Sequence, residues 1–121
     1  MIESLLKQFE ITPELNFTST TFGILFNFYG KKRNYLEIQN LYSSMKQNGI
    51  HMAHKTLGSY ITALCNCQHV EKAVETFEMA KNTEIQINLY HYTSLIKGLA
   101  NSGDFRNAFK YIEEVQNDTE I

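Results

Sequence analysis

A repeat of 35 residues constrains this chain more than any other feature of its sequence. Apolar residues at positions i, i+3, i+4 and i+7 recur three times at this offset, and that spacing places them on one face of an α-helix. The three sets are Phe22, Leu25, Phe26 and Tyr29, then Leu57, Tyr60, Ile61 and Leu64, and finally Tyr92, Leu95, Ile96 and Leu99. A fixed period of about 20 to 50 residues is typical of repeats that stack into a solenoid.

A second helical pattern follows each of these stripes at the same offset. Its members are Tyr35, Ile38, Tyr42 and Met45, then Val70, Ala73, Phe77 and Ala80, and finally Phe105, Ala108, Ile112 and Val115. Neither helix of a unit can bury its apolar stripe alone, so the pairs must stack. We therefore expect an all-α fold, an α-solenoid of about three 35-residue helix-turn-helix repeats. The expected interior residues are Tyr60, Ile61, Leu64, Phe77, Leu95, Ile96 and Ile112.

The repeat pattern also divides the chain. We expect an N-terminal partial repeat or cap over 1–18, where Leu5, Leu6 and Phe9 follow a short helical pattern. The three repeats then span 19–53, 54–88 and 89–121, and the third is incomplete.

Capping residues mark the joints between the expected helices. Asn34 opens a second helix with Glu37 three residues on, the spacing of a capping box. Asn88 precedes the helix that begins at Leu89. Gly103 ends that helix and Asp104 caps the next.

Composition and cysteine usage exclude several classes of protein. The chain has 121 residues, 43% of them hydrophobic, and no run of eighteen apolar residues, so we expect no membrane span. Cys65 and Cys67 are separated by one residue and are predicted to be reduced. With His69 they suggest a metal site, but structural zinc usually needs four ligands and no second cluster exists, so we favour a small core residue and expect no metal or cofactor.

Catalytic groups are not concentrated anywhere along the chain. The four histidines are scattered, and no serine or cysteine has a recognisable base and orienting acid near it. We therefore predict that the chain is not an enzyme by itself.

Charge is segregated between the two halves of each repeat. The first halves (19–33, 54–68 and 89–103) hold Lys31, Lys32, Arg33, Lys55 and Lys97 and no acidic residue, which gives +5. The rest of the chain holds six basic and thirteen acidic residues, which gives −7 and a total of −2. Because first helices share one wall of a solenoid, the positive charge should lie along that wall and could hold a phosphate backbone. The alternative is that the acids simply prefer the solvated convex face.

Short strings within the repeats resemble those of a known family, the pentatricopeptide repeat proteins. The resemblance covers residues 19–121 and rests on the 35-residue period, on YTSLIKGLANSGDFRNAF in the third repeat and on KQNGIHMA at 46–53. It implies an α-solenoid that binds organellar single-stranded RNA, with one nucleotide per repeat read by two or three side chains. The implied location is the mitochondrion or another organelle. Glu3 and Glu10 are untypical of a transit peptide, so none is predicted in this chain.

The resemblance also implies which residues would contact the RNA. In the family the fifth residue of a repeat reads a base together with the last residue, and the second residue packs against the base. The reading positions are Gly23 with Ala53, Gly58 with Asn88, and Thr93; the packing positions are Thr20, Lys55 and Tyr90. Glycine and alanine offer no side-chain donor or acceptor, so weak base specificity is expected. Lys31, Lys55 and Lys97 should add phosphate contacts in a row along the groove.

Two assignments and two functions remain open at this stage. Asn88 either reads a base or caps a helix, and Tyr90 lies off the apolar stripe, where it could stack on a base. The expected function is single-stranded RNA binding in organellar RNA metabolism or within a ribonucleoprotein. The alternatives are a protein–protein scaffold and the RNA-binding part of a longer RNA-processing enzyme. The apolar face of the last helix leads us to expect another protein subunit or a continuing segment at the C-terminal flank.

Overall fold

The structure, a computed structural model, describes residues 18–83 and 85–117. Within these residues it contains six α-helices and no strand, which confirms the all-α solenoid. The helices are α2 (Ser19–Lys31), α3 (Tyr35–Gln47), α4 (His54–Asn66), α5 (Val70–Ala80), α6 (Leu89–Asn101) and α7 (Phe105–Asn117). The short helix expected near the N-terminus lies outside the described residues.

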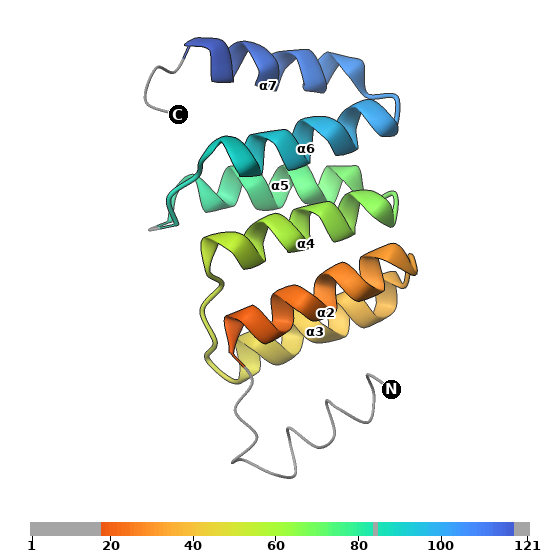
Figure 1. Cartoon of the computed structure of the whole chain (residues 1–121), viewed down its shortest axis with the longest axis vertical. Coiled ribbons are helices and arrows are strands. Elements are labelled where there is room, and N and C mark those ends of the chain that lie inside the picture. Colours follow the sequence, from red (N-terminus) through yellow and green to blue (C-terminus); the bar gives the residue numbers. More distant parts are fainter. Residues whose placement is uncertain (1–17, 84, 118–121) are drawn as a thin grey trace.

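The helices form two layers. The first helices α2, α4 and α6 run in the same direction, and each second helix runs back beside its partner (Figure 1). The first helices begin at Ser19, His54 and Leu89, which are 35 residues apart. Helix α4 packs against both α2 and α6, so the first helices make one continuous layer.

Capping explains why most of these helices begin where they do. The Thr18 hydroxyl accepts a hydrogen bond from the Thr21 backbone N–H (3.4 Å) at the start of α2. The side chains of Asn34 and Asp104 each accept one from a backbone N–H three residues on, at 3.3 Å in both cases. The predicted caps of α3 and α7 are therefore confirmed, whereas Glu37 does not complete the reciprocal half of a capping box; its side chain is buried.

The turn inside each repeat has the same backbone shape even though its residues differ. Arg33, Gln68 and Gly103 stand at equivalent positions and have φ of 55°, 67° and 88°. This left-handed conformation is easy for glycine and costly for the other two side chains. In each case the next residue's N–H bonds back to a carbonyl of the preceding helix, such as Asn34 N to Tyr29 O at 3.0 Å.

The core lies between the layers and confirms most of the apolar stripe. Tyr60, Ile61, Leu64, Phe77 and Leu95 are at most 3% exposed. The prediction was wrong for two residues, because Ile96 and Ile112 are only half-buried. Ile96 occupies the position of Phe26 and Ile61, but among the described residues no further first helix covers it. In α7 the fully buried residue is Tyr111, whose hydroxyl donates to Glu78 Oε2 at 2.6 Å.

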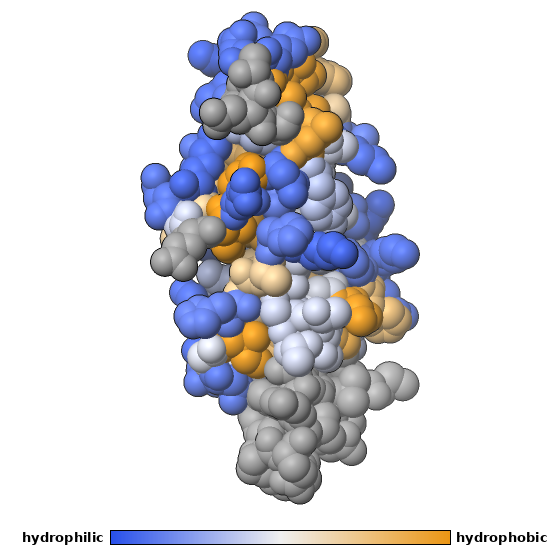
Figure 2. Space-filling view, turned by 60° about the vertical axis from the view of Figure 1, so that its left-hand side comes forward, coloured by the Kyte–Doolittle hydropathy of each residue, from blue (hydrophilic) through white to orange (hydrophobic). Residues whose placement is uncertain are grey.

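The last helix leaves apolar side chains exposed. Phe105 and Phe109 of α7 are 58% and 63% exposed. On the face shown in Figure 2, apolar surface occurs in separate patches among hydrophilic side chains, and one patch lies at the upper end of the molecule, where α7 is located. Within the described residues no helix is long and apolar enough to cross a membrane.

Candidate nucleic-acid interface

The outward face of the first helices carries five of the predicted contact residues. We define the first-helix wall as the solvent-exposed side chains Thr20 and Lys31 of α2, Lys55 of α4, and Tyr90 and Lys97 of α6. They occupy the second, ninth and thirteenth positions of their repeats. Separations of seven and eleven residues are close to two and three helical turns, so these positions share one helix face. The wall contains no acidic residue, because none occurs in α2, α4 or α6.

The lysines of the wall lie at different heights along their helices. Lys55 is in the first turn of α4, Lys97 is in the third turn of α6, and Lys31 ends α2. With a rise of 1.5 Å per residue, the levels of Lys55 and Lys31 differ by about 16 Å along the helix axis. In the order α2, α4, α6 the lysines therefore alternate between the end, the start and the third turn of their helices, and they do not form the single row that we expected from the sequence.

The glycine at the reading position of the second repeat is covered by the ring of Tyr90. A Cβ atom added at Gly58 would lie 2.1 Å from Cε2 and 2.6 Å from Cζ of Tyr90, so only glycine lets this ring lie across α4. Tyr90 remains 47% exposed, and its outer surface faces solvent. The sequence suggested two separate sites, an empty reading position and a packing tyrosine. In the structure they form one feature.

The other two reading positions have opposite environments. Gly23 is buried beneath the next repeat, and a Cβ there would lie 3.3 Å from Thr56 Oγ1. Thr93 is exposed on α6, where no following first helix covers it among the described residues. Of the three, only Thr93 presents an accessible side chain.

The last residues of the first two repeats, Ala53 and Asn88, form hydrogen bonds at the starts of first helices. The Asn88 side chain accepts a hydrogen bond from Tyr90 N–H at 2.9 Å, so it caps α6. Ala53 is exposed, and its N–H donates to Ser19 Oγ at 2.8 Å. The sequence left open whether Asn88 reads a base or caps a helix, and the structure shows that it caps α6.

Neighbouring first helices are joined by a polar contact that recurs at each junction. Thr56 Oγ1 donates to the carbonyl oxygen of Ser19 at 2.8 Å. At the next junction His91, which is fully buried, bonds through Nε2 to the carbonyl oxygen of His54 at 2.6 Å. Since His91 Nδ1 accepts from Asn88 N–H, Nε2 carries the proton and the ring is neutral. Burial lowers the pKa of His91, although the bond to His54 opposes this shift.

Small residues set how closely the first helices approach each other. A Cβ at Gly30 would lie 2.8 Å from Ala63 Cα, and one at Gly98 would lie 2.2 Å from Cys65 Sγ. Cys65 is buried, and burial raises the pKa of its thiol to about 11, so it is a packing residue and not a reactive thiol. The described residues contain no group of three or more His, Cys, Asp or Glu side chains that could hold a metal ion.

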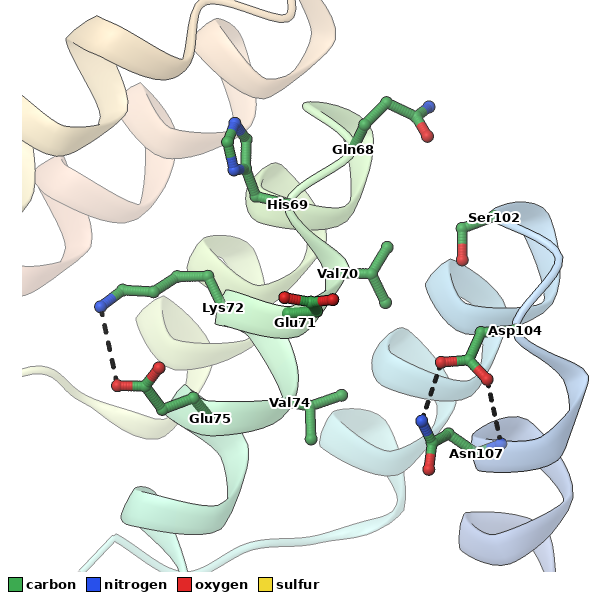
Figure 3. Close-up of a pocket in the computed structure, with 10 residues that line it drawn as sticks. All are labelled: Gln68, His69, Val70, Glu71, Lys72, Val74, Glu75, Ser102, Asp104 and Asn107. Atoms are coloured by element: carbon green, nitrogen blue, oxygen red, sulfur yellow. Dashed lines mark hydrogen bonds and ion pairs between the residues drawn. The ribbon is translucent and has the colours of Figure 1, made fainter.

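A cleft of about 670 Å³ lies between the start of α5 and the start of α7 (Figure 3). Its charged residues are mostly acidic or already paired: Lys72 lies 3.9 Å from Glu75, and both oxygens of Asp104 bind Asn107. This lining suits a phosphate backbone poorly. The first-helix wall is therefore the better candidate for RNA.

Comparison with known proteins identifies the repeats. A model of the pentatricopeptide repeat domain matches residues 75–119, and a model of the PPR repeat matches residues 20–50. The chain is also 31% identical over 93 residues to an Arabidopsis thaliana protein described as a mitochondrial pentatricopeptide repeat-containing protein. That match covers 76% of this chain but only 14% of the relative. With its 35-residue helical pairs and these matches to two parts of the chain, the protein belongs to the pentatricopeptide repeat family.

Proposed function

We propose that this chain binds single-stranded RNA along the first-helix wall, as a non-catalytic component of organellar RNA metabolism or of a ribonucleoprotein. The observation that carries the proposal is the chemistry of the wall, which presents lysines and an exposed tyrosine without any acidic residue. Lysines attract phosphates, and an aromatic face accepts any base. Family membership supports the same function, and the relative described as mitochondrial supports an organellar location.

Contact on this wall should depend on charge and stacking more than on base identity. Gly23 and Gly58 offer no side-chain donor or acceptor, and both are buried. Tyr90 is held in place by its contact with α4 and can stack on a base through its outer face. Replacing Tyr90 by leucine keeps an apolar contact with α4 but removes the ring. We expect about tenfold weaker binding, since base stacking contributes about 1–3 kcal/mol per base.

The decisive experiment reverses charge on the wall and compares it with the same reversal elsewhere. Lys55→Glu combined with Lys97→Glu should reduce affinity for a fluorescent single-stranded RNA by more than about tenfold. The dependence of log K on log salt should flatten by about 0.7 for each lost phosphate contact. Lys46→Glu combined with Lys110→Glu, on the second helices, changes net charge equally and should have little effect.

Thermal melting of both double variants should stay near that of the wild type, because exposed substitutions rarely change stability by more than about 0.5 kcal/mol. Equal losses of RNA affinity in the two variants would show that net charge, and not the wall, determines binding. Unchanged affinity in the wall variant would refute the proposal.

A protein–protein scaffold is the second candidate, and a separate observation favours it. Phe105 and Phe109 expose more than half of their surface on α7, where a further layer of helix would cover them. Sedimentation of the wild type against a Phe105→Ser, Phe109→Ser double variant tests this function. The scaffold function is supported if the wild type self-associates and the double variant does not. It is contradicted if both proteins sediment as monomers at high concentration.

A further inference from the structure

The junction between α5 and α7 is filled by a lysine bound to two carboxylates. Lys81, directly after α5, forms an ion pair with Glu78 (3.3 Å) and a second one with Glu114 of α7. The Tyr92 hydroxyl donates to Glu114 Oε1 at 2.8 Å. The Glu114 carboxylate therefore lies between a lysine and a tyrosine hydroxyl.

Aromatic rings enclose the same lysine. Lys81 Nζ lies 5.1 Å from the centre of the Phe77 ring, 5.9 Å from that of Tyr92 and 5.5 Å from that of Tyr111. Tyr111 is fully buried. Together the rings and carboxylates fill this junction with side chains of the chain itself.

The preceding junction, between α3 and α5, has an equivalent lysine but lacks the residues that bind Lys81. Lys46 is the counterpart of Lys81 one repeat earlier, and its Nζ lies 5.1 Å from the centre of the Tyr42 ring. However, Met79 stands in the position of Glu114, and Thr76 stands in the position of Tyr111. Among the described residues Lys46 forms no ion pair.

A cavity of about 280 Å³ occupies the space left by these replacements. Its lining includes Lys46, Thr76 and Met79, and also Tyr60, which is 3% exposed. The Tyr60 ring stacks on Tyr42, with centres 4.9 Å apart and planes 4° from parallel. No hydrogen bond joins the Tyr60 hydroxyl to any described residue, so this hydroxyl is available to a ligand in the cavity.

We propose that the cavity between α3 and α5 is a docking site for a partner protein that inserts an acidic side chain beside an aromatic one. The carboxylate binds Lys46 as Glu114 binds Lys81. Leu57 stands in the position of Tyr92, so the hydroxyl that donates to this carboxylate is that of Tyr60, from a different position of the first helix. The aromatic ring fills the space above Thr76 that Tyr111 fills one repeat later. Lys72, the other cation of the lining, is already paired with Glu75, so Lys46 supplies the free positive charge.

Charge complementarity and the filled α5–α7 junction both identify this occupant. An uncharged apolar segment would leave Lys46 and the Tyr60 hydroxyl without partners, which is costly for groups removed from water. Helices α3 and α5 are the second helices of their repeats, in the other layer from α2, α4 and α6 (Figure 1). The lining of the cavity contains none of the first-helix wall residues, so this partner and RNA would not compete for the same side chains.

The test uses the full chain with isotope-labelled methionine methyl groups, because Met52 and Met79 line the cavity and report on it directly. The probe is the blocked tetrapeptide acetyl-Tyr-Ile-Glu-Glu-amide, which carries the ring and carboxylate of the filled junction. We expect saturable shifts of both methyl signals with a Kd of about 1 mM or below. The neutral peptide acetyl-Tyr-Ile-Gln-Gln-amide should bind at least about tenfold more weakly.

Two variants and a matched control complete the experiment. Lys46→Met should weaken the probe at least about tenfold, whereas Lys110→Met should not, although Lys110 also lies over a tyrosine ring, at 5.2 Å. Met79→Glu supplies the chain's own carboxylate and should block the cavity. Equal affinity for the acidic and neutral peptides, or no effect of Lys46→Met, would overturn the proposal. So would glutarate binding as tightly as the acidic peptide, because the site would then hold a small anion and not a protein segment.

Discussion

The close approach of α4 and α6 at Gly98 and Cys65 yields a quantitative prediction. A Cβ at position 98 would lie 2.2 Å from Cys65 Sγ and 2.5 Å from Cys65 Cβ. The Cys65 thiol can rotate away, but the Cβ atom of Cys65 is fixed to the backbone of α4. Gly98→Ala therefore forces the two helices apart by about 1 Å, and overpacking of this kind costs about 1–3 kcal/mol. Because alanine favours the helix over glycine by about 1 kcal/mol, the net loss lies within about 0–2 kcal/mol, and we expect a value near the middle of this range.

A second substitution, Cys65→Gly, should relieve the overpacking that Gly98→Ala causes. With Cys65→Gly the nearest atom of residue 65 is its Cα, at 3.9 Å, which is ordinary van der Waals distance. Alone, Cys65→Gly loses helix propensity and a buried thiol, about 1–2 kcal/mol in total. In the double variant the new methyl group occupies the space of the lost thiol, so the total loss should be below about 1 kcal/mol. The two changes are then coupled by at least about 1 kcal/mol.

Urea denaturation followed by far-UV circular dichroism measures all four proteins of this cycle. A destabilisation of 1 kcal/mol corresponds to a fall in Tm of about 4 °C for a chain of this size, so thermal melting gives a second reading. Additivity within about 0.5 kcal/mol would show that residues 65 and 98 do not touch. A Gly98→Ala variant more stable than the wild type would refute the close packing of α4 on α6.

Three further outcomes follow from the same structure. Burial raises the pKa of Glu114, but the hydrogen bonds from Lys81 and Tyr92 outweigh burial and lower the pKa overall. The carboxylate therefore contributes fully to stability above the ordinary value of 4.5, and this contribution is lost as the pH falls through the lowered pKa. Glu114→Gln should accordingly flatten the acid limb of a stability–pH profile. Tyr111→Phe should cost about 1–2 kcal/mol in urea denaturation because it removes a buried hydroxyl bonded to a carboxylate, whereas Tyr60→Phe, whose hydroxyl has no bond to a described residue, should stay within about 0.5 kcal/mol. Affinities for poly-U, poly-A and poly-C of equal length should agree within about tenfold, and a larger preference would show that other residues read the bases.

The sequence predicted the helices well because their signals are local. Apolar spacing and capping chemistry act within one or two turns, so the starts of α3 and α6 at Tyr35 and Leu89 could be predicted from the sequence alone. The errors at Ile96 and Ile112 have a different origin. Burial of these side chains depends on which helix stacks next, and periodicity within one helix contains no information about that neighbour.

Contacts between repeats were the main feature that sequence reasoning missed. Gly58 was interpreted as a reading position without a side chain, whereas in the structure it accommodates Tyr90 of the next repeat. The clue available in the sequence was size: a glycine is paired with a bulky ring one repeat later. The pairs Gly30 with Ala63 and Cys65 with Gly98 give a clearer signal, since both pairs of small residues have the same separation along the chain.

The two polar contacts between neighbouring first helices differ in their dependence on pH. One joins Thr56 to Ser19, and the other joins His91 to His54. The contact at the first junction is made by a hydroxyl, whereas the contact at the second junction is made by an imidazole, which can take up a proton as the pH falls. Since the pKa of buried His91 is lowered, its contribution is complete above about pH 6.5 and disappears as the pH falls through that lowered value. Mild acid should then weaken the junction of α4 with α6 more than that of α2 with α4, and hydrogen exchange should show a larger loss of protection in α6 than in α2.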